Sequence, residues 1–279
     1  MPGYRVDRFT KAMLDEDRAF QAGREPGWTM PDFDLPTVAG GRVRKSDFMG
    51  RRPVLLTFAS LTDPMAASAV PVLKALYRRY GDAVAFITVY VREAHPGEHI
   101  PQPRTLDWKV RHARMLRERD ALPWIVAVDD LEGGLHRALG GNSNAAHLMD
   151  PNGNVAFRTL WSNDERVLAA ALEAVAAGRP DHPFERERRV VPFARGLARV
   201  DDVVRAAGPS ALDDLRRETP LVFAAAEVAW AWRALTPLGR LAAAGAVAFV
   251  AAGAYAAVRI ALRPRRRDRA RLGALAALL

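Results

Sequence analysis

The feature that most constrains this chain is a largely apolar six-residue run that leads into a Thr-Asp-Pro corner. Val54–Ala59 has the length and composition of a strand buried on both faces, as the central strands of parallel sheets are. Asp63 followed by Pro64 is typical of a helix start, because a carboxylate accepts free backbone N–H groups and proline fits the first helical turn. The sequence therefore predicts a strand over 53–59 and a helix over 64–80 capped by Asp63.

Strands and helices alternate along the rest of this region. The expected order is a hairpin around Gly40-Gly41, the strand and helix above, a strand over 84–91, a helix over 105–120, a strand over 124–128, a short helix near 131–139, a hairpin of 145–149 with 155–160, and a helix over 163–177. A β-α-β run implies parallel strands joined by right-handed crossovers. The order predicts an α/β domain over 30–180 with a central mixed sheet flanked by helices, preceded by an N-terminal arm over 1–29 that holds a short polar helix at 8–22.

The sequence changes character after residue 180. Residues 181–193 are charged and interrupted by proline, and we expect a linker there. The region 181–220 is expected to continue as amphipathic helices of unknown partner. Ser210 with Asp213 resembles a capping box that would open one of these helices.

Residues 221–262 are expected to associate with a membrane. The segment 241–258 carries no charged residue, and with its extension to 262 it is long enough to span a bilayer. The alternative is a buried helix of a soluble bundle. The arginine-rich tail at 263–279 should stay cytoplasmic, and the N-terminus has no signal-peptide pattern. We therefore expect a cell-membrane protein with a single-pass or helical-hairpin anchor and its folded domain on the cytoplasmic side.

The composition excludes several function classes. The chain has no cysteine, which rules out disulfides, thiolate metal sites and cysteine nucleophiles within it. The formal net charge is +9, but 37 of the 41 basic residues are arginine, which indicates a compositional bias. No nucleic-acid-binding motif accompanies the charge, so we expect no nucleic-acid partner.

Two strings carry a family resemblance. The segment Phe58-Ala59-Ser60-Leu61-Thr62-Asp63-Pro64, together with Glu93-Ala94-His95-Pro96 after the second strand, resembles the iodothyronine deiodinase family. That family is a selenoprotein branch of the thioredoxin superfamily with many bacterial relatives. The resemblance covers about 30–175, and residues 30–48 also look like the N-terminal hairpin of peroxiredoxin-type redoxins. It implies a thioredoxin-like fold.

The resemblance also implies that the reactive atom is missing. Asp63 stands where the family carries selenocysteine or cysteine, and Leu61 stands where it carries a nearby cysteine. The stretch 142–145, which matches the cis-proline position of thioredoxin folds, has no proline. A carboxylate cannot pass through sulfenyl or selenenyl states, so thiol-based redox chemistry is expected to be lost.

The candidate site residues surround this corner. Asp63 is either only a helix cap or a catalytic or ligand-binding carboxylate. Glu93 and His95 are the candidate acid–base partners, since a carboxylate and a histidine two residues apart can share a proton, although His95 has a structural alternative as a loop histidine. The expected groove is lined by Thr62, Pro64, Ser143 and Asn144.

We expect no cofactor and no metal, because Pro96-Gly97 interrupts the Glu/His spacing around Glu93, His95, Glu98 and His99. The other histidines, including His112, give no site signal. The leading hypothesis is a non-redox protein that binds a partner protein or a small ligand in the old groove. The alternatives are an acid–base enzyme using Asp63, Glu93 and His95, and a structural subunit of a membrane complex.

Overall fold

The computed structural model describes residues 4–17, 20, 23, 25–179, 190–231, 235 and 239. Contacts divide the chain into one unit that ends at Trp230 and a second that begins at Ala231. Among the described residues, none of the helices combines the length and the apolar character that crossing a membrane requires. The predicted membrane segment at 241–262 and the arginine-rich tail lie outside the described residues.

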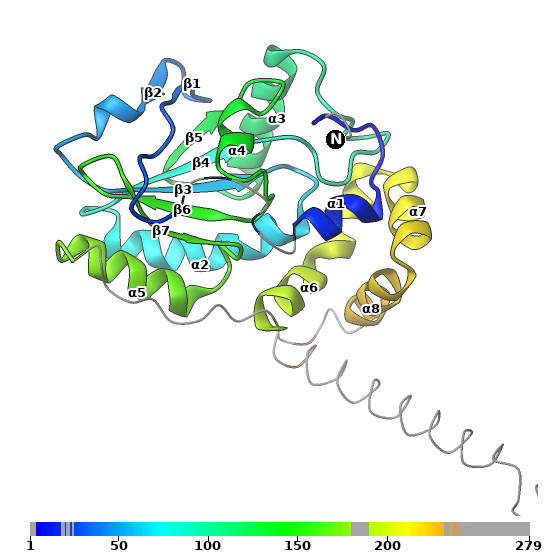
Figure 1. The fold of residues 1–279 in the computed structure, drawn as a ribbon. Helices are drawn as coiled ribbons and strands as arrows, with labels where there is room; N and C mark the ends of the chain where they lie inside the picture. The colour runs from blue at the N-terminus through cyan, green and yellow to red at the C-terminus, as the bar shows by residue number, and fades with distance from the viewer. Residues whose placement is uncertain are drawn as a thin grey trace, which may run out of the picture. The chain divides into compact units, whose positions relative to one another are not determined.

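A five-stranded mixed sheet forms the centre of the first unit (Figure 1). Its strands are β3 (Val54–Ala59), β4 (Ala85–Tyr90), β5 (Ile125–Val128), β6 (Ala146–Met149) and β7 (Val155–Thr159). The order across the sheet is β5-β4-β3-β6-β7, with β3, β4 and β5 parallel and the β6–β7 hairpin antiparallel. All six residues of β3 and of β4 are buried, as expected for central strands covered on both faces.

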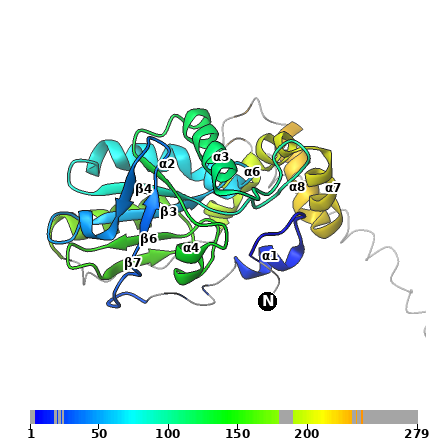
Figure 2. The same cartoon turned by 90° about the horizontal axis from the view of Figure 1, so that it is seen from above.

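Helices and a small hairpin cover the two faces of this sheet. One face packs against α2 (Pro64–Tyr80), α3 (Leu106–Arg119) and α5 (Glu165–Ala176). The other face packs against α4 (Gly134–Ala138) and against the hairpin of β1 (Asp34–Pro36) and β2 (Arg42–Arg44). A 3-10 turn, Lys45–Asp47, follows β2. Figure 2 shows α2 and α3 on one side of the strands and α4 on the other. This arrangement is a thioredoxin-like α/β fold, as the sequence predicts.

Four further helices gather at the end of the sheet where β3 and β4 finish (Figures 1 and 2). They are α1 (Lys11–Glu16), α6 (Val190–Ala207), α7 (Pro209–Glu218) and α8 (Pro220–Ala231). An apolar cluster joins them, built from Phe9, Met13, Val200, Val204, Ala207, Ala211, Leu215 and Ala226. The amphipathic helices after residue 180 therefore pack against the N-terminal segment and the domain itself. We call residues 4–17 together with α6, α7 and α8 the cap.

Polar contacts hold the two parts of the cap together and fix the cap to the domain. The guanidinium of Arg8 donates two hydrogen bonds, 2.6 and 2.7 Å long, to the carboxylate of Asp214, whose side chain is fully buried. The carboxylate of Glu98, in the loop after β4, accepts from the backbone N–H of Ser210 at 3.0 and 3.1 Å. The backbone N–H of His99 donates to the carbonyl of Ala207 at 2.9 Å. The end of α6 and the start of α7 are thus held by the loop that carries the Glu-Ala-His-Pro string.

Three local predictions need correction. Within the described residues the first helix covers only Lys11–Glu16, shorter than the expected 8–22. α6 begins at Val190, inside the range expected to be linker. The capping box at Ser210 is wrong: Gly208 is the N-cap and Pro209 opens α7. The carboxylate that serves this helix start comes from Glu98 in a distant loop, which no local spacing can show.

Candidate functional site

Asp63 caps α2 at the corner after β3. Its Oδ1 accepts from the backbone N–H groups of Met65 at 2.8 Å and Ala66 at 3.1 Å, which confirms the predicted cap. The side chain is buried. The Ser143 hydroxyl lies within reach but donates to Asp17 Oδ2 at 2.9 Å. Asp63 Oδ2 is left with no hydrogen-bond partner among the described residues.

A second carboxyl group, that of the partly buried Asp17, lies near Asp63 at this corner. Asp17, at the end of α1, accepts from the Ser143 backbone N–H and hydroxyl, both at 2.9 Å. Burial raises the pKa of Asp63 to about 7, and the nearby charge of Asp17 adds to that rise while the cap hydrogen bonds oppose it. Burial likewise raises the pKa of Asp17. Near neutral pH, Asp63 is therefore about half protonated.

Glu93 lies in a saturated network beneath the corner. Its carboxylate accepts from the backbone N–H and hydroxyl of Thr62 at 3.2 and 2.7 Å, from the Tyr90 hydroxyl, and from Nδ1 of His112 at 2.9 Å. The Nε2 of His112 accepts from the indole N–H of Trp108 at 2.9 Å, which assigns the Nδ1–H tautomer. Glu93 has no exposed surface. Its contacts tie the loop before α2 to the end of β4 and to α3.

The predicted hydrogen bond between Glu93 and His95 is not formed, because Thr62, Tyr90 and His112 already satisfy the carboxylate. His95 instead stacks on Phe9 of the cap, with 4.2 Å between ring centroids. Its Nδ1 has no hydrogen-bond partner among the described residues. Burial lowers the pKa of His95 to about 4, with Asp214 partly opposing, so the ring is neutral at physiological pH.

A cavity of about 80 Å³ lies between the domain and the cap. Asp63 and His95 both line it. Its other walls are Pro64, Met65, Arg92, Ala94 and Ser143 from the domain, and Phe9, Met13, Leu14, Asp17, Phe193, Gly196, Leu197, Val200, Leu215, Thr219 and Val222 from the cap. The space is enough for several water molecules or for one molecule of a few heavy atoms.

The predicted groove residues divide into two groups. Pro64 and Ser143 line the cavity, whereas Thr62 and Asn144 do not. Thr62 is buried against Glu93, and Asn144 Oδ1 accepts a hydrogen bond from the Ser162 hydroxyl. Within the described residues, no group of three His, Cys, Asp or Glu side chains is placed to hold a metal ion.

Sequence reasoning missed Asp17, Arg92 and His112. Asp17 comes from the N-terminal arm, 126 residues before Ser143, so only the folded chain brings the two together. Arg92 donates to the Tyr4 carbonyl at 3.0 Å and lines the cavity. For His112 a signal existed: Trp108 and His112 are four residues apart and share one face of α3.

One protein-family model matches part of this chain. Residues 12–144 match the family model of iodothyronine deiodinase. This part of the chain is iodothyronine deiodinase-like. Type II iodothyronine deiodinase of Neoceratodus forsteri is 29% identical over 175 residues, covering 57% of this chain and 61% of that protein. Thyroxine 5-deiodinase of Sparus aurata is 31% identical over 126 residues, 41% of this chain and 46% of that protein. The chain spans about half the length of the curated relatives it matches.

Two solved structures that are similar to this chain are named as thiol–disulfide proteins. A putative thiol:disulfide interchange protein DsbE from Chlorobium tepidum has a TM-score of 0.44 and 21% identity, covering 55% of this chain and 98% of that one. A putative protein disulfide isomerase from Bacteroides thetaiotaomicron has a TM-score of 0.44 and 15% identity, covering 55% of this chain and 91% of that one. The chain described here has no cysteine.

Proposed function

We propose that this protein is a non-redox binding protein that takes a small, uncharged, partly apolar molecule into the cavity beside Asp63. One observation carries the proposal: Asp63 and His95 both line the cavity, and each has a buried polar atom, Oδ2 and Nδ1, without a hydrogen-bond partner among the described residues. Leaving a buried polar group unsatisfied costs roughly 1–3 kcal/mol. A ligand that bonds to both groups recovers that cost.

The charges around the cavity favour an uncharged ligand. An anion would meet the carboxyl groups of Asp63 and Asp17, and Arg92, which also lines the cavity, is already paired with Glu16 at 3.7 Å. A cation would be taken out of water into walls that include Leu197, Val200 and Val222. A neutral molecule with one hydroxyl or amide group avoids both costs.

The size and closure of the cavity favour a small ligand over a protein partner. Sites for drug-sized molecules enclose roughly 300–1,000 Å³, several times the volume available here. A partner protein would first have to displace the cap, which is held to the domain by the Glu98–Ser210 contact and by the hydrogen bond from the His99 N–H to the Ala207 carbonyl. The closed arrangement accepts a molecule of a few heavy atoms without that step.

The test uses two methionines that line the cavity. With methyl-labelled methionine in the full chain, titration with 1-butanol should shift the NMR signals of Met13 and Met65. The signal of Met115, which is 49% exposed on α3, serves as the internal control and should not move. Butyrate, with the same chain length and a negative charge, should have little effect. If Met13 and Met65 respond no more than Met115, the proposal is wrong.

An acid–base enzyme is the second candidate, favoured by one observation. Burial places the pKa of Asp63 at about 7, which suits a general acid or base at neutral pH. Glu93 has no direct part in such chemistry, because it is saturated and has no surface in the cavity. With p-nitrophenyl acetate as the probe, hydrolysis should rise through about pH 7 and be lost in Asp63→Asn. Equal rates for both proteins at every pH would leave only the binding function.

We further propose that residues 241–262 anchor the chain in a cell membrane. The support is the uncharged run in the sequence and the arginines that follow it. Expressed in bacterial cells, the full chain should remain with membranes after carbonate extraction, and a chain ending at residue 235 should be released. Release of both would refute the anchor.

A further inference from the structure

A second and larger cavity lies at the opposite end of the sheet from Asp63. β3 and β4 are parallel, with Val54 paired to Ala85 at their starts and Ala59 paired to Tyr90 at their ends. Both strands therefore begin at the same end of the sheet. Asp63 follows the last residues of β3, whereas the second cavity is lined by Phe86 near the start of β4. A six-residue strand is roughly 20 Å long, so the two sites do not share a wall. The second cavity has a volume of about 560 Å³, within the range of small-molecule sites.

Packed aromatic rings form the floor of this second cavity. Tyr77 of α2 lies 5.4 Å from both Phe86 and Trp124, and the rings of Phe86 and Trp124 are 5.9 Å apart. The indole N–H of Trp124 donates to the Thr88 hydroxyl at 2.9 Å, which fixes the ring. Tyr77 and Ile125 are only partly buried and present apolar surface to the cavity. The floor is a preformed surface for a flat apolar group.

Positive charge surrounds this floor. Three arginines and one aspartate line the cavity: Arg42, Arg52, Arg117 and Asp47. Arg42 is engaged by Asp34, with Nε 2.5 Å from Oδ1, and Asp47 accepts from the backbone N–H of Arg44 at 2.8 Å. For Arg52 and Arg117, no carboxylate of the described residues lies within ion-pair distance.

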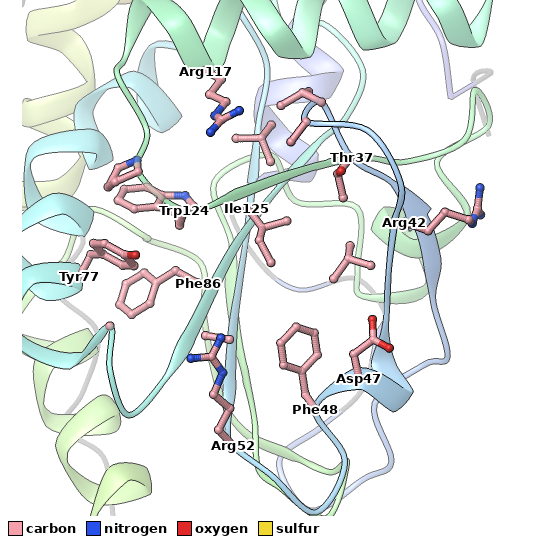
Figure 3. Close-up of a pocket in the computed structure, with 17 residues that line it drawn as sticks. Thr37, Arg42, Asp47, Phe48, Arg52, Tyr77, Phe86, Arg117, Trp124 and Ile125 are labelled. Carbon is pink, nitrogen blue, oxygen red and sulfur yellow. The ribbon is translucent and has the colours of Figure 1, made fainter.

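The two unpaired arginines approach the floor from different elements. Arg52 precedes β3 and is exposed, and Arg117 lies in the last turn of α3 and is half-buried. Figure 3 shows Arg117 above and Arg52 below the row formed by Trp124, Ile125 and Phe86. A planar guanidinium group binds carboxylates and also stacks on aromatic rings. A ligand that has both an acid group and a ring can therefore make both interactions here.

We propose that this second cavity binds a small aromatic anion. The ring of the ligand lies on the surface of Tyr77 and Ile125, and its acid group pairs with Arg52 or with Arg117, which lie on opposite sides of that surface (Figure 3). A cation is disfavoured by the three arginines, and a purely aliphatic molecule leaves both free guanidinium groups unused. The proposal is independent of the cavity at Asp63, which shares no residue with this one.

The experiment is isothermal titration calorimetry of the full chain with two probes of the same shape. Naphthalene-2-carboxylate is charged and naphthalene-2-carboxamide is not. The carboxylate should bind at least tenfold more tightly than the amide, with the difference shrinking at high salt. The double variant R52Q/R117Q should bind the two probes equally, because the charge preference resides in those two side chains.

The matched control is Arg78→Gln, which removes an exposed arginine next to Tyr77 that does not line the cavity. It should retain the tenfold preference. The proposal is overturned if the carboxylate does not bind, if the wild-type chain binds both probes equally, or if Arg78→Gln loses the preference as fully as the double variant. All replaced side chains lie at the surface, and a circular dichroism spectrum unchanged from wild type confirms that each variant is folded.

Discussion

Replacing Asp63 by asparagine tests the account of the corner through its dependence on pH. Asparagine is as good an N-cap as aspartate and keeps an oxygen for the N–H groups of Met65 and Ala66. It removes only the ability to ionise. Burial raises the pKa of Asp63 from its ordinary value of 3.8 to about 7. Each pH unit of that rise corresponds to about 1.4 kcal/mol, so the whole shift is worth about 4 kcal/mol.

The sign of the effect follows from which state binds the proton. Between pH 4 and pH 7 the unfolded chain has lost the Asp63 proton while the folded chain still holds it, so the free energy of unfolding falls as the pH rises. Above pH 7 both states are ionised and the loss is complete. Asp63→Asn should therefore match the wild-type free energy of unfolding near pH 4 and exceed it by up to about 4 kcal/mol at pH 8.

The assay is urea denaturation of the full chain at several values between pH 4 and pH 8, followed by tryptophan fluorescence. Asp82→Asn removes an exposed charge after α2 and should not show this pH-dependent gain. Asp63→Ala loses the cap and should be destabilised by roughly 1–2 kcal/mol relative to Asp63→Asn at every pH. An Asp63→Asn variant that is less stable than wild type at pH 8, or a difference that does not change with pH, would refute the reasoning.

Three further substitutions test the network and the cap, the first two by the free energy of unfolding and the third by limited proteolysis. Glu93→Gln should cost roughly 1–3 kcal/mol, because its NH2 group cannot accept the hydrogen bonds that a carboxylate oxygen accepts, and the loss should be smaller when His112→Gln is already present; additive losses would contradict the coupling. Arg8→Ala should cost about 1–3 kcal/mol by removing two hydrogen bonds to buried Asp214, and an unchanged stability would mean that this contact does not join the N-terminal segment to α7. Gly97→Ala would place a Cβ 2.4 Å from the backbone oxygen of Ala207 at the end of α6 and should expose the cap to limited proteolysis, and unchanged cleavage would contradict this close approach.

Much of the fold is predictable because its signals are local. The helix Pro64–Tyr80 has the predicted bounds, since Asp63-Pro64 marks its start and Gly81 its end. The buried strands β3 and β4 are apolar runs that need no partner to be recognised. The hairpin of β6 and β7 follows from the turn at 151–154, where Gly153 adopts a positive φ of 83°.

The site is less predictable, because its decisive contacts join distant segments. Asp63, Pro64 and Ser143 are found from sequence, but the closure of the corner by the cap is not. Phe9 reaches His95 and Asp17 reaches Ser143 only once the chain has folded. Glu93 and His95 are two residues apart in sequence, yet the histidine that bonds to Glu93 is His112 on α3. The tertiary fold, and not the sequence spacing, brings these two side chains together.

The most direct test of the central claim is a crystal structure of the full chain at a resolution that shows ordered water. The account predicts density inside the cavity between the cap and the domain, from water or a small molecule hydrogen-bonded to both Asp63 Oδ2 and His95 Nδ1. A collapsed cavity, with those two atoms bonded to the protein's own groups, would contradict it.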